Sequence, residues 1–200
     1  YTTLFRSTTL ENNFKVTPQQ LEDAITPKTK LIMFSSPSNP TGMLYTKEEL
    51  KGIADVVAKH PHVFVMADEI YEHINFEGKH ESLAQFDYVK EQVITINGLA
   101  KGFAMTGWRI GFIGAPLLIA KACDKLQGQV TSATCSIAQR ATITAMELDP
   151  ANSKDIIDMR NKFRERRDMM FKLLKDIPNI KVILPQGAFY FFPEVNAYYG

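Results

Sequence analysis

The sequence has 200 residues, 45% of them hydrophobic and 22% charged, a balance typical of a globular protein with a packed core. Its formal net charge is +1 and its basic residues are interspersed with acidic ones, which argues against a nucleic-acid-binding or anionic-membrane-binding protein. No apolar run is long enough to cross a bilayer and no metal-binding motif accompanies the two cysteines, so we expect a cytoplasmic protein that binds no metal.

Two helices in the first part of the chain are marked by capping residues. Thr17 is the expected N-cap of the first helix, followed by Pro18 at the first helical position and by Gln20, which completes a capping box. Thr46 and Glu49 repeat this signature at the start of a second helix, in which apolar residues recur at helical spacing.

Short apolar runs at residues 30–36, 62–71 and 92–98 are predicted to be strands, and residues 108–115 are predicted to be a fourth. The first three runs do not alternate between apolar and polar residues, which is typical of strands that are buried on both faces. Because capped helices lie among these runs, we expect an α/β fold with a mostly parallel sheet sandwiched by helices.

The remainder of the chain is predicted to be mainly helical. One helix begins at Pro116, and a long helix begins near Ser153, with alternating charges that we interpret as a solvated face. Cys123 and Cys135 fall in segments with helical patterns, and we expect both to be free, partly buried thiols.

The sequence pattern changes from about Ser153 onward. Residues 180–184 and 188–193 are interpreted as a strand pair that follows the long helix. We therefore expect residues 1–152 to form part of one large domain, and residues 153–200 to contain a linking helix and the start of a small C-terminal α+β domain.

Polar residues follow the ends of the three apolar strands. In open parallel sheets ligands bind at the carboxyl ends of the strands, so Asn39, Asp68, Tyr71 and Lys101 are expected to meet in one crevice. Each has another explanation when taken alone: a turn for Asn39, a helix N-cap for Asp68, core packing for Tyr71 and an exposed loop for Lys101.

Taken together, these residues predict a particular chemistry. A lysine amine in a partly desolvated, glycine-lined pocket can lose its proton and form a Schiff base with an aldehyde, which pyridoxal 5'-phosphate offers. Asp68 could hold the pyridine nitrogen and Arg109 the phosphate, while Tyr71 and Asn39 could bind the ring hydroxyl. Lys101 is the candidate for the reacting amine.

Four motifs, "SNPTG", "ADEIYEHINFEG", "NGLAKGFAMTGWRIGFIGAP" and "PQGAFYFFPEV", stand in the same order and at similar separations as in class I and II aminotransferases. The chain thus resembles this family, and bacterial aspartate aminotransferases in particular. The resemblance implies the fold type I of pyridoxal-phosphate-dependent transferases, a homodimer, and transfer of an amino group between an amino acid and a 2-oxo acid. Aspartate and 2-oxoglutarate are the expected substrates, with specificity for alanine, for aromatic amino acids or for a broader range as the alternatives.

The resemblance also implies a role for each candidate residue. Lys101 resembles the Schiff-base lysine that moves a proton at the substrate α-carbon, and Asp68 the carboxylate that keeps the pyridine nitrogen protonated. Tyr71 resembles the tyrosine bonded to the ring hydroxyl, Asn39 the asparagine beside it that also touches the substrate carboxylate, and Arg109 the phosphate-binding arginine.

Other features of the family cannot be placed in this sequence. Gly98 stands where many members have a phosphate-binding serine. The resemblance places a phosphate-binding turn, a ring-stacking aromatic residue and a carboxylate-binding arginine outside the 200 residues, so we expect a central fragment that is inactive alone. A pyridoxal-phosphate-dependent lyase of the same fold and a non-catalytic protein are the alternative interpretations.

Overall fold

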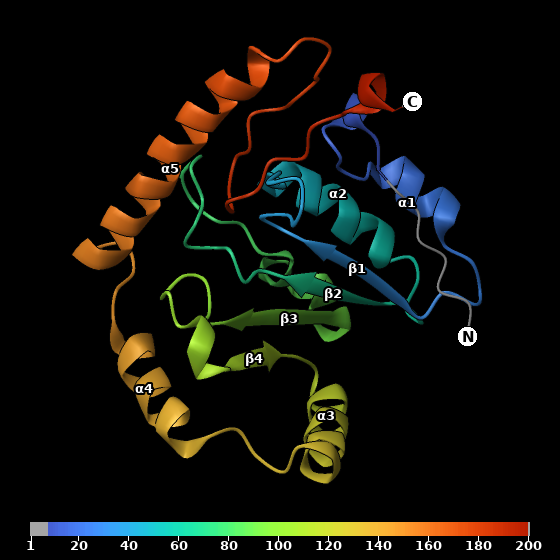
Figure 1. Ribbon diagram of the computed structural model, residues 1–200. Coiled ribbons are helices and arrows are strands. Elements are labelled where there is room, and N and C mark those ends of the chain that lie inside the picture. The colour runs from blue at the N-terminus through green and yellow to red at the C-terminus, as the bar shows by residue number, and fades with distance from the viewer. Residues whose placement is uncertain (1–7, 200) are drawn as a thin grey trace.

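A four-stranded sheet organises the computed structural model, which describes residues 8–199 (Figure 1). Its strands are β1 (Leu31–Ser35), β2 (Phe64–Asp68), β3 (Val93–Gly98) and β4 (Gly111–Gly114), and they lie side by side in chain order. The first three are parallel, while β4 runs antiparallel to β3. The four predicted strands and the mostly parallel sheet are therefore confirmed.

Helices α1 (Pro18–Ala24) and α2 (Lys47–Val57) begin at the predicted caps. The hydroxyl of Thr17 accepts a hydrogen bond from the Gln20 amide at 3.1 Å, and that of Thr46 accepts one from the Glu49 amide at 3.2 Å. Each N3 side chain returns a bond to the cap amide, which completes both capping boxes.

These two helices cover one face of the sheet (Figure 1). The apolar side of α2 packs with Ile32 and Phe34 of β1, Val65 of β2 and Val93 of β3 in one core cluster. Met33, on the opposite face of β1, is 69% exposed. Among the described residues, coverage of β1 is thus one-sided, because successive side chains of a strand point to opposite faces.

Three longer helices follow the sheet: α3 (Leu117–Val130), α4 (Ser136–Glu147) and α5 (Lys154–Lys175). Cys123 lies in α3, but Cys135 is the N-cap of α4 rather than a helical residue. Both thiols are free as expected, but both are exposed rather than partly buried, because α3 buries none of its residues and Cys135 lies in the loop between the helices.

Short 3₁₀ helices complete the regular structure: Leu10–Asn12, Leu83–Gln85, Asp87–Gln92, Thr106–Trp108 and Asn196–Tyr198. None of the helices within residues 8–199 is both long enough and apolar enough to span a membrane.

The strand pair predicted after α5 is wrong. Residues 180–193 form no regular strand, and only an isolated bridge joins Lys181 to Glu194. The reason is that the backbone in the middle of this segment bonds to other loops: the Ala188 amide donates to the Ile74 carbonyl at 2.8 Å. The domain division at Ser153 stays a prediction.

The charged face of α5 is also less solvated than predicted. Arg167 is largely buried, donates to the Pro185 carbonyl at 3.0 Å and lies 4.8 Å from the Phe76 ring. Arg164 donates to the Phe76 carbonyl at 2.9 Å. Helix α5 is therefore bound through its arginines to the segments that follow β2 and that precede the C-terminus.

Candidate cofactor-binding site

The carboxyl ends of the three parallel strands meet at one edge of the sheet. Ser35 pairs with Asp68, and Asp68 pairs with Ile96, so β1, β2 and β3 end at nearly the same level. Gly111, the first residue of the antiparallel β4, pairs with Gly98, the last residue of β3. The start of β4 therefore joins the same edge.

All five candidate residues lie in segments that leave this edge or lead to it. Asn39 follows β1, Asp68 ends β2, and Tyr71 lies three residues further along. Lys101 follows β3, and Arg109 lies two residues before Gly111, where β4 begins. The sheet topology thus brings to one edge the segments that carry Asn39, Asp68, Tyr71 and Lys101, which the sequence predicted to meet, and the segment that carries Arg109 leads to the same edge.

The amine of Lys101 lies near two aromatic rings that contact each other. Its Nζ is 5.9 Å from the centroid of the Tyr71 ring and 5.6 Å from that of Phe189. Gly102, beside it, packs so closely on His73 that a Cβ there would lie 2.6 Å from the imidazole Cδ2. Lys101 is therefore a half-buried lysine in an aromatic and glycine-lined setting, not an exposed loop lysine.

Tyr71 is buried, with 3% of its surface exposed. Its hydroxyl oxygen lies 2.5 Å from that of Tyr190, and its ring meets the Phe189 ring edge-on at 5.3 Å. Burial raises the pKa of the Tyr71 phenol above its ordinary value, and Tyr190 and the negative charge of Asp68 raise it further. The phenol therefore keeps its proton at neutral pH and can donate a hydrogen bond.

Asp68 does not cap a helix. One of its carboxylate oxygens accepts a hydrogen bond from the Ile70 amide at 3.1 Å, and residues 69–82 form turns and irregular structure rather than a helix. The helix-cap explanation for this aspartate is therefore wrong. Its half-buried carboxylate instead lies at the end of an inner strand of the sheet.

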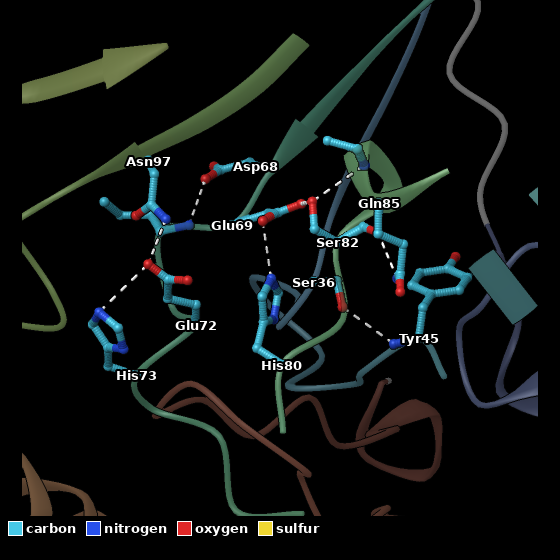
Figure 2. A network of polar contacts seen from close by, with 12 residues as sticks. Ser36, Tyr45, Asp68, Glu69, Glu72, His73, His80, Ser82, Gln85 and Asn97 are labelled. Carbon is cyan, nitrogen blue, oxygen red and sulfur yellow. Dashed lines mark hydrogen bonds and ion pairs between the residues drawn. The ribbon is translucent and has the colours of Figure 1, made fainter. Parts of the chain in front are cut away.

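A buried network of polar contacts holds the segment after β2 in place (Figure 2). Glu69, only 5% exposed, accepts a hydrogen bond from the Ser82 hydroxyl at 2.7 Å, and its other oxygen lies 3.0 Å from Nε2 of His80. A buried carboxylate requires such partners, because burial without them is costly. The network therefore fixes the backbone beside Asp68.

A second branch of this network connects the same segment to β3 (Figure 2). The Asn97 side chain donates to Glu72 at 2.7 Å, and the same oxygen of Glu72 lies 3.4 Å from Nε2 of His73. Asn97 also accepts a hydrogen bond from the Gly98 amide at 2.7 Å. The chain that carries Tyr71 is thus tied to the strand that leads to Lys101.

Within residues 8–199, no hydrogen bond or ion pair joins Asn39 or Arg109 to this group. Asn39 is exposed, and its amide donates to the Ser35 hydroxyl at 3.3 Å. Arg109 has left-handed backbone angles, with φ of 52°, and its guanidinium donates to the Thr106 carbonyl at 2.9 Å. Arg109 lines a hollow of about 750 Å³, of which Lys101 is not a lining residue. Their binding roles stay predictions.

Gly98 has a structural reason to lack a side chain. A Cβ at this position would lie 2.9 Å from both the Gly111 Cα and the Ile110 carbonyl oxygen, and 3.3 Å from Ile70. A serine hydroxyl therefore cannot occupy this position unless β3 and β4 move apart.

The site also contains two aromatic residues that the sequence analysis did not identify as site residues, Phe189 and Tyr190. Both belong to the "PQGAFYFFPEV" motif, which was given no site role. The nearby backbone is pinned: the Gln186 and Gly187 amides both donate to the Gly42 carbonyl at 2.9 Å. The available signal in the sequence was the pair of aromatic residues two positions after Gly187.

Gly42 explains why the "NPTG" turn ends in glycine. Its φ is +71°, a left-handed angle that favours glycine, and a Cβ on it would lie 2.5 Å from Cβ of Pro185. The turn after β1 and the segment before Phe189 are therefore in direct backbone contact.

The polar side chains at this edge fit pyridoxal phosphate. The group offers an aldehyde, a basic ring nitrogen, a ring oxygen and a phosphate, for which an amine, a carboxylate, a protonated phenol and a guanidinium are suitable partners. Among the ion pairs of residues 8–199, none involves Lys101, Asp68 or Arg109. These three charges thus stand without a protein counter-ion in the described part of the chain.

Comparison with known proteins finds relatives of this chain. The chain is 42% identical over 194 residues to an aspartate aminotransferase from Pinus pinaster, covering 96% of this chain and 39% of that protein. A probable aspartate/prephenate aminotransferase from Rhizobium leguminosarum is 41% identical over 203 residues, covering 100% and 50%. The chain thus spans half or less of the length of these two relatives.

A solved structure shows the same fold. The crystal structure of the aspartate aminotransferase from Rhizobium meliloti matches with a TM-score of 0.88 and 36% identity, covering 92% of this chain and 46% of that one. The predicted α/β fold, that of the fold type I pyridoxal-phosphate enzymes, is therefore confirmed. The sequence model of the family "Aminotransferase class I and II" matches residues 3–198. The chain belongs to the class I and II aminotransferases.

Proposed function

We propose that the protein carrying this sequence is a pyridoxal-phosphate-dependent aminotransferase that moves an amino group between an amino acid and a 2-oxo acid. The observation that carries the proposal is the placement of the Lys101 amine beside the protonated phenol of Tyr71, at the edge where the Asp68 carboxylate ends β2. The names of the relatives give independent support.

Each residue has a task that suits its chemistry. When bound, pyridoxal phosphate supplies an aldehyde that condenses with amines and a ring that withdraws electrons. Lys101 would hold the cofactor and move a proton at the substrate α-carbon, and Asp68 would accept a hydrogen bond from the ring nitrogen. Tyr71 and Asn39 would bind the ring oxygen, and Arg109 would bind the phosphate.

Aspartate is the proposed amino acid substrate, because both relatives described above have aspartate in their names. 2-Oxoglutarate is proposed as the 2-oxo acid from the family resemblance. A homodimer in the cytoplasm, and a small domain that begins at Ser153, belong to the same proposal. A lyase of the same fold is the alternative, and it is distinguished by its products: a lyase releases ammonia or elimination products, whereas an aminotransferase releases a 2-oxo acid.

Chemical trapping tests the proposal directly. The protein is incubated with pyridoxal phosphate and reduced with borohydride, and the modified lysine is located by peptide mass spectrometry. We expect the label on Lys101, and no stable label in Lys101→Ala. Lys79→Ala is the matched control, because the Lys79 side chain is 85% exposed and lies outside the site. Label spread evenly over surface lysines in the protein at its natural length would contradict the proposal.

A further inference from the structure

The hydroxyl contact between Tyr71 and Tyr190 has no part in the roles given above. The two oxygens lie 2.5 Å apart, at the short end of the range for hydrogen bonds between hydroxyl groups. The rings meet nearly at right angles, 83° between planes, with centroids 5.7 Å apart. In the described part of the chain, Tyr71 is the hydrogen-bond partner of the Tyr190 hydroxyl.

The contact is held from both sides by the backbone. The Phe76 amide donates to the Gln186 carbonyl at 2.8 Å, and the Ala188 amide donates to the Ile74 carbonyl at 2.8 Å. These bonds join the segment after Tyr71 to the segment before Tyr190. The two phenols therefore face each other because two loops are paired, although 119 residues separate them in the chain.

Helix α5 braces the same segment. The Phe163 ring stacks on the Phe189 ring at 5.2 Å with planes 27° apart, and Phe163 packs against the cluster that contains Tyr71. Arg167 of the same helix donates to the Pro185 carbonyl. Tyr190 is thus mounted on a segment whose position depends on α5.

The direction of the hydroxyl contact follows from the task of Tyr71. A phenol has one proton, so of two bonded phenols one donates and the other accepts. If Tyr71 donates its proton to the ring oxygen of the cofactor, its own oxygen must accept from Tyr190. Hydrogen bonds in such a chain polarise one another, so the bond from Tyr190 strengthens the bond that Tyr71 gives.

We propose that Tyr190 is a positioning residue, whose hydroxyl donates to Tyr71 and commits the Tyr71 proton to the ring oxygen of the cofactor. This inference rests on the proposed function. If Tyr190 acts in this way, the charge state of the cofactor ring oxygen depends on the position of residues 185–190. That position in turn depends on α5.

The charged and titratable groups around Tyr71 are few, which makes the effect measurable. Asp68 faces it from the end of β2, Lys101 from the loop after β3, and Tyr190 from the C-terminal segment. Phe189 contributes only an apolar ring. A change confined to the Tyr190 hydroxyl therefore leaves the other charges of the site in place.

The test is a pH titration of the visible absorption of the lysine-bound cofactor, in the protein at its natural length. A hydrogen bond to the ring oxygen stabilises its anionic form, so removing Tyr71 by Tyr71→Phe should raise the apparent pKa of the absorption by about 1 to 2 units. Tyr190→Phe should raise it by about half a unit, because it weakens that bond without removing it.

The double variant Tyr71→Phe/Tyr190→Phe identifies the route. Because Tyr190 acts through Tyr71, the double variant should titrate like Tyr71→Phe alone. Tyr198→Phe is the matched control, since its hydroxyl donates to the Pro178 carbonyl at 2.5 Å in the same C-terminal region, and it should leave the titration unchanged. Phenylalanine retains each ring, so the packing of the segment persists.

Three outcomes would overturn the inference. An unshifted titration in Tyr190→Phe would show that its hydroxyl does not act on the cofactor. A further shift in the double variant would show that it acts by a route other than Tyr71. If the parent protein gives no visible absorption with pyridoxal phosphate, the proposed function fails and this inference fails with it. This third outcome is recognised in the parent protein alone, whereas the first two require the variants.

Discussion

Gly98 shows how one residue can decide both strand pairing and site chemistry. It ends β3, pairs with Gly111 and leaves no room for a Cβ between the two strands. The backbone amide of Gly98 already donates to Asn97, so this position keeps β3 and β4 close rather than presenting a hydroxyl. Any phosphate contact at this point of the site would have to come from other groups.

Replacement of this glycine by the serine found in many family members tests that reading. Gly98→Ser should lower the free energy of unfolding by about 1 to 3 kcal/mol, because its Cβ would overpack against the β4 backbone. Urea denaturation followed by circular dichroism measures the change. Gly114→Ser is the control on the same sheet, since a Cβ at Gly114 has no neighbour within 4 Å. Equal destabilisation by both variants would contradict the packing argument.

At the level of elements, α5 is a structural brace for the site-bearing loops. Arg167 places its guanidinium against the Pro185 carbonyl and over the Phe76 ring, and thereby joins two loops that meet near Lys101. The alternating charges of the α5 sequence predicted only a solvated face, because a pattern of charges does not show which arginines donate hydrogen bonds to buried carbonyl groups.

The contribution of this arginine can be isolated with its neighbour. Arg167→Ala should lower the free energy of unfolding by about 1.5 to 3 kcal/mol, because it removes a charged hydrogen-bond donor and leaves a carbonyl without its partner. Arg166→Ala, one residue earlier and exposed, should change it by less than about 0.5 kcal/mol. Thermal unfolding of both variants, compared at the melting temperature of the parent, measures the difference. Indistinguishable stabilities would show that α5 does not brace the loops.

The elements that the sequence predicted correctly are those specified by local chemistry. Thr17 and Thr46 form capping boxes with residues three positions away, and β1, β2 and β3 lie in the apolar runs of the sequence. The burial on both faces that these runs predicted is wrong for β1, where Met33 is exposed. Residues 180–193 have the composition of strands, but they are not strands because their amides bond to the turn at Gly42 and to the segment at Ile74. Pairing of that kind depends on residues more than a hundred positions away, which no local pattern records.

At the scale of the whole molecule, the candidate site shows the same difference between features set by strand order and features set by contacts between distant loops. The positions of Asp68 and Lys101 could be predicted, because parallel strands release their chains at one edge. Tyr190 could not be placed beside Tyr71, because the contact forms through tertiary pairing of two irregular loops. Asn39 and Arg109 lie at the predicted edge, but in the described part of the chain neither forms a hydrogen bond with Asp68, Tyr71 or Lys101. The sheet topology therefore did not determine their side-chain contacts.

The exposed apolar side chains predict how the 200-residue chain behaves in solution. Leu118 and Val130 of α3 are 77% and 71% exposed, and Met33 on the uncovered face of β1 is 69% exposed. Surfaces of this kind favour association. We therefore expect the isolated chain to form larger species as its concentration rises, which sedimentation velocity would record as an increasing sedimentation coefficient.

Substitution on α3 locates the responsible surface. Leu118→Ser/Val130→Ser should reduce association while leaving the melting temperature within a few degrees, because side chains that are already exposed contribute little to folding. Lys121→Ser, a substitution at an exposed polar residue of the same helix, should leave association unchanged. If the double variant associates as strongly as the parent, the contact surface does not lie on α3. Met33→Ser should then weaken the association, because Met33 is an apolar side chain on a face of β1 that no element of the described chain covers.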